Sequence, residues 1–363
     1  MKIIINAASI FKGGAEQVAN SFINECRNIS HNDYHIFLCD NIYKTLELNA
    51  FGSNFHFYKL EKRTGASILN LIKTLRYFDR LEKEIQPDVV ISTGGHGYWM
   101  PKVPLITGFN IPHYVYPESP YFDTISVWRK IYWKLKKQFD LFFYRRSDAI
   151  IVQTDDVNFR VKKLLRGQDI QVHTVSNTVN GVFTDPSFTK SMLPPKEKGE
   201  VRLLTLSSNY AHKNLGVIRD VIDNLIEDGE AKVKFILTLP EEALGNFKKE
   251  KYQPYLINVG PIPIDQCPAL YSECDMMFLP TLLECFSASY AEAMAMEKLI
   301  LTSDLPFARV VCKEAAIYFD PVDPVDIADK IQNLIKSPNV QKELIQKGRN
   351  IFKCRFKYTK NVF

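Results

Sequence analysis

The sequence lacks the features of a membrane-spanning or exported protein. Among its 363 residues, no stretch reaches about 18 uninterrupted apolar residues, the length that a spanning helix needs. The apolar run in the opening MKIIINAAS is too short for the core of an export signal and is more typical of a first strand. We therefore expect a cytoplasmic protein.

Cysteine pairs and blocks of one charge are absent as well. The seven cysteines are dispersed, and none forms a C-x-x-C pair, which argues against a zinc site or a disulfide framework and suits a reducing compartment. The net charge of +5 comes from 46 basic and 41 acidic side chains, and no Lys/Arg block dominates a domain. We therefore expect no nucleic-acid partner.

Two nucleotide-binding motifs are missing. Without G-x-G-x-x-G the chain does not look like a nicotinamide dehydrogenase, and without G-x-x-x-x-G-K-[ST] it does not look like a P-loop NTPase. The first turn instead holds Gly13 and Gly14, just before a helix predicted from about Ala15. Paired glycines let backbone N–H groups approach an anion at a helix N-terminus, although the turn could serve only to start the helix.

Short, continuous apolar runs recur along the chain, separated by amphipathic segments of helical length such as 66–86, 214–228 and 323–337. Such runs predict parallel strands that are buried on both faces. The first series lies at 2–6, 35–39, 88–93, 103–107, 148–154 and 171–175, and the second at 201–206, 232–238, 255–260, 275–280 and 298–303. Two series predict an α/β protein with two doubly wound, Rossmann-like domains.

The segment 185–200 is rich in proline, lysine and glycine and has no periodicity, which is typical of a linker. We place the boundary near residue 190, so the predicted domains are 1–190 and 191–363. Two such domains predict a central cleft between the carboxyl ends of two sheets, the usual ligand position in open α/β proteins.

The first turn of the second domain, LSSNYAHKNLGVI, carries Lys213 where a phosphate would meet the turn, with Asn214 able to cap the next helix. A lysine there can act as a point charge for a diphosphate. A solvated surface lysine is the alternative.

A later strand-to-helix turn, ECFSASYAEAMAMEKLIL at 284–301, has a carboxylate at Glu284 and another at Glu292. The small residues 287–289 between them would let a phosphate or a sugar hydroxyl reach the N–H groups of the first helical turn. A carboxylate can also accept two vicinal hydroxyls, as on a ribose. The alternative is a capping carboxylate plus an ordinary helical glutamate.

Together these motifs resemble the donor-site region of family 4 glycosyltransferases, the group 1 transferases, which have the GT-B fold. The resemblance covers nearly the whole chain. The family motifs are E-x7-E as Glu284 and Glu292, its lead-in as Pro280, Thr281 and Phe286, E-A-M-A as Glu292 to Ala295, G-G-x-E as Gly13 to Glu16, and H-K-N as His212 to Asn214.

The resemblance implies retaining transfer of a sugar from a nucleotide-diphosphate donor of the UDP or GDP type. Glu284 would hold the donor sugar, Glu292 would bind the ribose, and Lys213 would neutralise the leaving diphosphate. No D-x-D pair occurs in the chain, so we expect neither a metal nor another cofactor. Further donor contacts are expected from Gly13, Gly14, Ser208, Asn209, Phe286, Ser287 and Ala288.

In the first domain, the family commonly has a histidine that faces the donor sugar. The matching stretch GFNIPHYVYPESP offers His113, Tyr116 and Glu118. His113 leads as a catalytic candidate because imidazole both donates and accepts, which leaves Tyr116 and Glu118 on the acceptor side. His96 would also face the acceptor, unless it is a plain loop histidine.

Two departures from the family affect the expected function. Ser208 stands where the family usually has an arginine, five residues before the phosphate lysine, so stabilisation of the leaving group would rest more on Lys213. The chain ends at Phe363, so the closing helix that crosses back to the first domain is expected to be short or missing. These departures would allow a non-catalytic nucleotide-sugar-binding subunit, whereas the intact Glu284 and Lys213 argue against it.

We therefore expect a metal-independent, retaining hexosyltransferase that acts on a glycan or a lipid-linked glycan in the synthesis of a cell-surface polysaccharide such as lipopolysaccharide. A nucleotide-sugar epimerase with the GT-B fold is a further alternative, because it would share the phosphate site and transfer nothing to an acceptor.

The segment 127–146 predicts one helix with a core-facing apolar stripe and an opposite basic face. Trp133, Leu141 and Tyr144 lie among the basic residues, so we expect this helix to hold the protein against the anionic inner face of a membrane. A solvated basic face is the alternative. The predicted stripe is Trp128, Ile131, Tyr132, Leu135, Phe139, Phe142 and Phe143, and the basic residues are Arg129, Lys130, Lys134, Lys136, Lys137 and Arg145.

Overall fold

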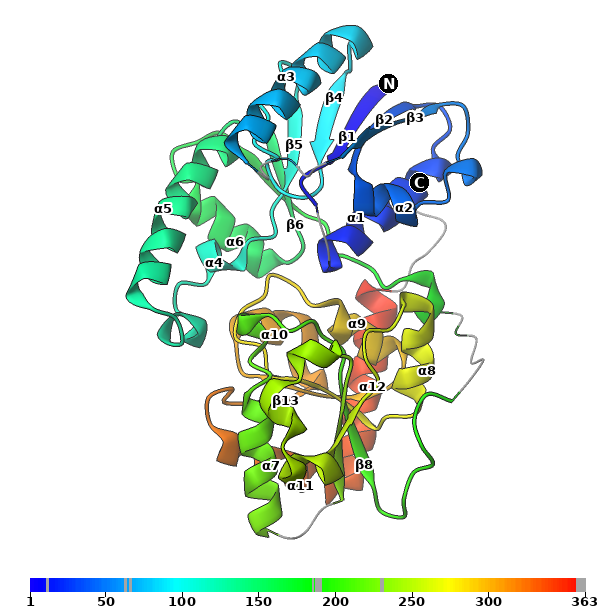
Figure 1. Ribbon diagram of the computed structural model, residues 1–363, viewed down its shortest axis with the longest axis vertical. Helices are drawn as coiled ribbons and strands as arrows, with labels where there is room; N and C mark the ends of the chain where they lie inside the picture. The colour runs from blue at the N-terminus through cyan, green and yellow to red at the C-terminus, as the bar shows by residue number, and fades with distance from the viewer. Residues whose placement is uncertain are drawn as a thin grey trace. The chain divides into compact units, whose positions relative to one another are not determined.

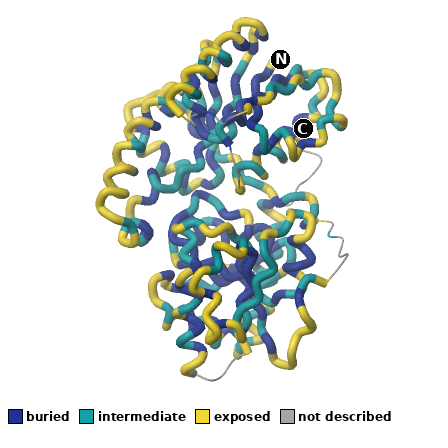
Figure 2. Tube along the Cα trace, in the orientation of Figure 1, coloured by how far each residue is buried: buried dark blue, intermediate teal, exposed yellow. Residues whose placement is uncertain are grey.

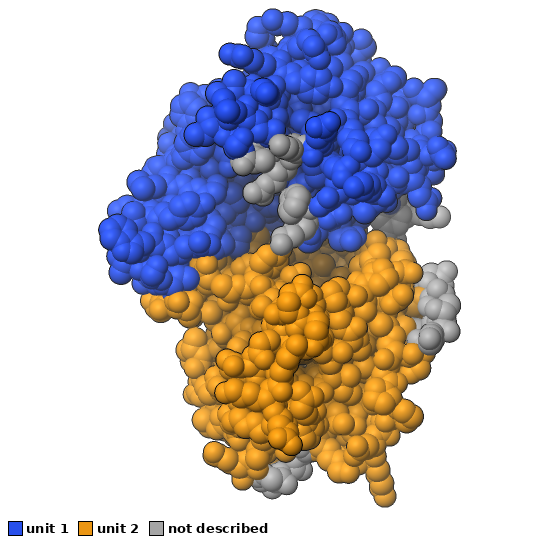
Figure 3. Space-filling view, in the orientation of Figure 1, with its two compact units in different colours: residues 1–115, 125–175 blue, residues 116–124, 176–363 orange. Residues whose placement is uncertain are grey.

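The computed structural model describes residues 1–10, 13–61, 64, 67–184, 186, 191–228 and 232–356. The chain divides into two compact units (Figure 3). The first contains Met1–Val115 and Ile125–Val175, and the second contains Tyr116–Thr124 and Ser176–Phe363. Each unit is built on one parallel sheet, which confirms the predicted fold class of two parallel α/β domains.

This division differs from the predicted boundary near residue 190, which is outside the described residues. The first unit ends at Val175, and Tyr116–Thr124 belongs to the second unit although it lies between two parts of the first in sequence. Contacts of this segment within the second unit include Ser119 Oγ with the Leu282 carbonyl at 2.6 Å, the Tyr116 ring with Phe307 at 5.9 Å and the Tyr121 ring with His212 at 6.4 Å.

In the first unit, the described strands form a seven-stranded sheet in the order β3-β2-β1-β4-β5-β6-β7, and neighbouring strands pair in parallel (Figure 1). All six predicted strands are confirmed. The strands are β1 (Lys2–Ala7), β2 (Asp33–Cys39), β3 (Phe55–Leu60), β4 (Val89–Ser92), β5 (Leu105–Gly108), β6 (Ala149–Val152) and β7 (Gln171–Thr174). The helices are α1 (Gly14–Glu25), α2 (Asp40–Thr45), α3 (Ile68–Ile85), α4 (Pro112–Val115), α5 (Val127–Tyr144) and α6 (Asp155–Leu164).

The two faces of this sheet are buried separately, as alternating side chains require. One core joins Ile3 and Ile5 of β1 to Ile23 of α1, whereas the other joins Ile4 of β1 to Phe78 of α3. The edge strand β3 was not among the predicted strands. Of its six residues, three are partly buried and two are exposed, so it has no continuous apolar run.

In the second unit, the described strands form a six-stranded sheet in the order β10-β9-β8-β11-β12-β13, again with parallel pairing. All five predicted strands are confirmed. The strands are β8 (Val201–Thr205), β9 (Val233–Leu237), β10 (Leu256–Asn258), β11 (Met276–Leu279), β12 (Leu299–Ser303) and β13 (Ile317–Phe319). The helices are α7 (Val217–Asp228), α8 (Cys267–Ser272), α9 (Ala288–Ala295), α10 (Pro306–Cys312), α11 (Pro324–Ile335) and α12 (Pro338–Arg355). The last residues, 357–363, on which the expected crossover depends, lie outside the described residues.

The predicted helix at 127–146 exists as α5, but the prediction of its buried face was wrong. Most of the predicted core stripe is exposed, including Trp128 at 80% and Leu135 at 67%. Figure 2 shows much of α5 in the colour of exposed residues. The buried residues are Asp140, Leu141 and Tyr144, from the face predicted to be basic. No helix among the described residues is long and apolar enough to cross a bilayer.

A buried polar cluster explains the inverted orientation of α5. The Asp140 side chain is fully buried and accepts hydrogen bonds from Lys136 Nζ at 2.5 Å and from Tyr114 Oη at 2.7 Å. Its other oxygen lies 3.4 Å from His96 Nε2. Burial alone would raise the pKa of Asp140, but hydrogen bonds from His96, Lys136 and Tyr114 outweigh it and lower that pKa. The charged network therefore fixes which face of α5 is buried.

The orientation of α5 can be tested with two substitutions. Asp140→Ala should destabilise the protein by about 3–5 kcal/mol, because it leaves buried donors without their acceptor. Leu135→Ala should change stability by less than about 0.5 kcal/mol, because that side chain is exposed. Urea unfolding of both variants measures the difference. A larger loss for Leu135→Ala than for Asp140→Ala would restore the orientation predicted from the sequence.

Candidate functional site

The candidate site of the second unit begins at the turn after β8. A short 3₁₀ helix, Ala211–Lys213, is followed by Asn214 in a left-handed conformation (φ 53°), and Asn214 Nδ2 donates to the Pro321 carbonyl at 2.8 Å. This turn aims the Lys213 ammonium at Glu284 Oε1, with which it forms a close ion pair. Both side chains keep some exposure, 15% for Lys213 and 13% for Glu284, so a ligand can reach the pair.

The turn after β11 is tied directly to the turn after β8. The Leu282 N–H donates to the His212 carbonyl at 2.7 Å, and Thr281 Oγ1 donates to the same carbonyl at 3.1 Å. Because β8 and β11 are neighbouring parallel strands, their carboxyl ends bring these two turns together. The sheet therefore positions two residues that are 71 positions apart in sequence.

His212, which was not among the predicted site residues, lies between these turns. Its ring stacks on Tyr210 with a centroid distance of 5.6 Å. Burial lowers the pKa of His212, the nearby Lys213 adds to this effect, and Glu284 opposes it. A neutral imidazole is therefore favoured beside the ion pair. The only sequence signal for His212 was its place in the HKN triplet.

The N-terminus of α9 lies on the same turn as Glu284. Its N-cap residue is Ser287, whose side chain makes no capping hydrogen bond. Ser287 is buried, Ala288 is exposed, and Phe286 is half-buried. The first turn of α9 thus presents small side chains around backbone N–H groups, an arrangement that suits an anion.

Glu292 lies one turn further along α9 and is buried. Its Oε2 accepts a hydrogen bond from Tyr271 Oη at 3.3 Å. Burial raises the pKa of Glu292 to about 7, and the hydrogen bond from Tyr271 lowers it only in part. Near neutral pH the carboxyl can therefore hold or release a proton as its surroundings change. Two other predicted donor residues, Ser208 and Asn209, are exposed in the turn after β8.

The first unit holds its predicted residues in separate places. Gly13 is the N-cap of α1 with φ 81°, a conformation that favours glycine, and Gly14 opens that helix with free space where a side chain would lie. His113 lies on α4, and its ring stacks on Trp133 at 3.7 Å. His96 is a core residue at 5% exposure, stacked on Phe143.

The remaining two predicted residues, Tyr116 and Glu118, lie in the segment that packs with the second unit. Tyr116 is buried at 1% exposure, whereas Glu118 is exposed. In the second unit, Lys213 and Glu284 form an ion pair, and Ser287 and Glu292 lie at the start of and within the helix that follows Glu284. The residues predicted on the acceptor side are divided between the two units.

The chain is similar to known glycosyltransferases. Residues 247–351, which contain β11, α9 and both glutamates, match the family "Glycosyl transferases group 1". The O-antigen chain mannosyltransferase RfbU of Salmonella typhimurium is 20% identical over 244 residues, which span 65% of this chain and 64% of that protein, slightly less than two thirds of its length.

Two solved structures show the same fold over most of their length. HepE of Anabaena, in complex with UDP and glucose, has a TM-score of 0.70 and 15% identity over 98% of this chain and 96% of its own. WaaG, a glycosyltransferase involved in lipopolysaccharide biosynthesis, has a TM-score of 0.69 and 10% identity over 97% of this chain and 95% of its own. The predicted resemblance is thus confirmed: the chain has the GT-B fold, and residues 247–351 of its second unit match the group 1 glycosyltransferases.

The buried Glu292 predicts a specific dependence of stability on pH. Its pKa in the folded protein, about 7, lies above the ordinary value of 4.5. The folded state therefore binds the proton of the Glu292 carboxyl more tightly than the unfolded state does. The stabilisation of the folded protein by this proton is complete below about pH 4.5 and is lost as pH rises through 7. Glu292→Gln, which stays neutral, should exceed the wild type in stability at pH 8 by on the order of 1–3 kcal/mol, and should differ little at pH 5.

Melting temperatures at pH 5 and pH 8 test this prediction, with Glu227→Gln on the exposed side of α7 as the matched control. The control should show no pH-dependent difference from the wild type. An equal difference between Glu292→Gln and the wild type at both pH values would contradict the raised pKa.

Proposed function

We propose that this protein is a retaining glycosyltransferase that moves a hexose from a nucleotide-diphosphate sugar to a glycan or lipid-linked glycan acceptor during the synthesis of a cell-surface polysaccharide. The observation that carries this proposal is the Lys213–Glu284 pair beside the N-terminus of α9. In this arrangement, the Lys213 ammonium and the N–H groups of the helix would bind a diphosphate. The Glu284 carboxylate would accept hydrogen bonds from the hydroxyls of a sugar.

In this proposal, the ion pair separates when the donor binds. The diphosphate takes the Lys213 ammonium, which leaves the Glu284 carboxylate free to accept hydrogen bonds from the hydroxyls of the sugar. As the bond to the sugar breaks, negative charge grows on the leaving diphosphate, where Lys213 and the positive end of the α9 dipole stabilise it. Transfer then needs no divalent metal.

Glu292 binds the ribose in the same proposal. A raised pKa means that burial disfavours the carboxylate, so two ribose hydroxyls that donate to it would favour the ionised form. The names of the relatives support this class of donor. One is a mannosyltransferase of the O-antigen chain, and another was solved with UDP and glucose. Both observations favour a hexose on a nucleoside diphosphate.

The proposal is tested by incubating the protein with labelled UDP- and GDP-hexoses, with and without lipid-linked glycan from bacterial membranes. Glu284→Gln should lower the rate of transfer on the order of 100-fold or more. Lys213→Ala should also lower the affinity for the free nucleoside diphosphate. Lys198→Ala, an exposed lysine outside the site, serves as the control, and EDTA should leave the rate unchanged.

Three results would contradict the proposal in different ways. Conversion of the nucleotide sugar without an acceptor would indicate an epimerase, and binding without any reaction would indicate a non-catalytic subunit. Near-wild-type transfer by a folded Glu284→Gln variant would remove this residue from the mechanism.

We further propose that α5 docks this protein on an anionic membrane surface. Its exposed side carries an apolar stripe that includes Trp128, Leu135 and Phe139, at 80%, 67% and 53% exposure. The one acid within α5, Asp140, is fully buried, so the exposed charges of this helix are all positive. Apolar side chains can enter the interface, and the lysines and arginines elsewhere on the helix are attracted to anionic lipids, at about 1 kcal/mol for each basic residue near the surface.

Liposome co-sedimentation tests this docking. The double variant Trp128→Ser/Leu135→Ser should abolish binding to vesicles that contain anionic lipid. The double variant Lys130→Glu/Lys134→Glu should abolish the electrostatic part of this binding, which is the part that high salt weakens. Lys137 is left unchanged, because its ammonium donates to the Tyr114 carbonyl at 3.0 Å. The control Ile68→Ser/Leu69→Ser changes two exposed apolar residues of α3 and should bind like the wild type. Failure of the wild type to bind anionic vesicles at low salt would refute the docking.

A further inference from the structure

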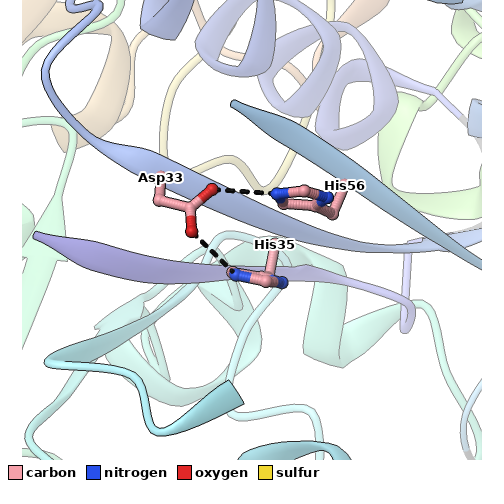
Figure 4. A group of neighbouring side chains, drawn as sticks. All are labelled: Asp33, His35 and His56. Carbon is pink, nitrogen blue, oxygen red and sulfur yellow. Dashed lines mark hydrogen bonds and ion pairs between the residues drawn. The ribbon is translucent and has the colours of Figure 1, made fainter. Parts of the chain in front are cut away.

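Three ligand-type side chains meet at the amino ends of β2 and β3. Asp33 and His35 are two residues apart on β2, so the period of the strand puts them on the same face of the sheet. The parallel register pairs His35 with His56 of β3, which brings the second histidine to that face. Figure 4 shows both rings turned toward the Asp33 carboxylate.

The geometry of this Asp33–His35–His56 cluster is tight. Asp33 Oδ1 lies 3.0 Å from His56 Nε2, and Asp33 Oδ2 lies 3.5 Å from His35 Nε2. The two rings stack with centroids 4.7 Å apart. One ligand atom from each residue lies within 4.8 Å of the other two, and no other group of this kind occurs among the described residues.

The polar groups of the cluster are incompletely satisfied. His35 is 8% exposed, and its Nδ1 is bonded to Tyr58 Oη at 3.0 Å. Its Nε2 is buried and has no hydrogen-bond partner, although it points at the carboxylate. If Nδ1 donates to Tyr58, the lone pair of Nε2 faces a negative oxygen, an arrangement that a cation between them would relieve.

We propose that Asp33, His35 and His56 bind a divalent transition metal ion of the zinc type. Two imidazoles and one carboxylate are ordinary ligands for Zn²⁺, and water can fill the fourth position. Metal–ligand bonds of about 2.0–2.1 Å place two ligand atoms of a tetrahedral site about 3.3 Å apart. The distances from Asp33 Oδ1 to His56 Nε2, 3.0 Å, and from Asp33 Oδ2 to His35 Nε2, 3.5 Å, are close to this value. The bond from His35 to Tyr58 also resembles the second interaction that orients a metal-bound imidazole.

The position of the site indicates a structural role. β3 is the edge strand of the sheet, and a metal bound to His56 would join it to β2. The cluster lies at the amino ends of these strands, whereas the Gly13 turn follows the carboxyl end of β1. The metal site is therefore separate from the site of the proposed sugar transfer. The proposal of metal binding can be tested whether or not the proposed function is correct.

Calorimetric titration of the full chain with ZnCl₂, after removal of metals by a chelator, tests the site. The background is Cys354→Ser, because Cys354 is an exposed thiol that could bind zinc by itself. We expect one site per chain, with affinity lost at least about 10-fold in His56→Gln and in Asp33→Asn. His173→Gln, an exposed histidine on the opposite edge strand β7, should bind zinc like the background protein.

Melting temperatures provide the second measurement. Zinc at about 100 times its Kd should raise Tm by several degrees in the background protein and in His173→Gln, and should leave Tm unchanged in His56→Gln and Asp33→Asn. Both cluster variants change partly exposed side chains, so their Tm without zinc reports whether they fold. No binding by the background protein, or binding that both cluster variants retain, would overturn the proposal.

Discussion

The parallel pairing of β8 with β11 is the constraint on which the candidate site depends. Because both strands run in the same direction, the turns that follow them meet at one edge of the sheet, and the His212 carbonyl joins them through two hydrogen bonds. An antiparallel partner would place the residues after β11 at the opposite edge. The Lys213–Glu284 pair is thus a consequence of sheet topology, and the local sequence only supplies the two charges.

The two glutamates of α9 and its preceding turn differ through burial. Glu284 keeps a neighbouring ammonium and some solvent, so its charge is balanced without a ligand. Glu292 has one hydroxyl partner and almost no solvent, so its charged form is unfavourable until a donor approaches. In the proposed function, a ligand at Glu284 would have to open an ion pair, and a ligand at Glu292 would offset a desolvation cost.

Continuous apolar runs predicted all strands except the edge strand β3 and the short β13, because burial on both faces leaves a direct mark on the sequence. The donor residues were predicted from motifs at the carboxyl ends of those strands. The face of α5 could not be predicted, because two stripes on it have helical spacing. Apolar content favoured the stripe with Leu135, but the network of Asp140, formed with residues far away in sequence, decided the orientation.

Several features of this chain run against ordinary packing rules, and that makes them informative. A buried carboxyl at Glu292, an exposed tryptophan at Trp128 and an unpartnered ring nitrogen at His35 each leave a cost that the described structure does not fully offset. In natural proteins propensity, pattern and packing generally agree, so exceptions of this kind are expected where a ligand or a surface supplies what the chain alone lacks. In the functions proposed above, each exception has its complement: hydroxyl donors for Glu292, an apolar and anionic interface for Trp128, and a cation for His35.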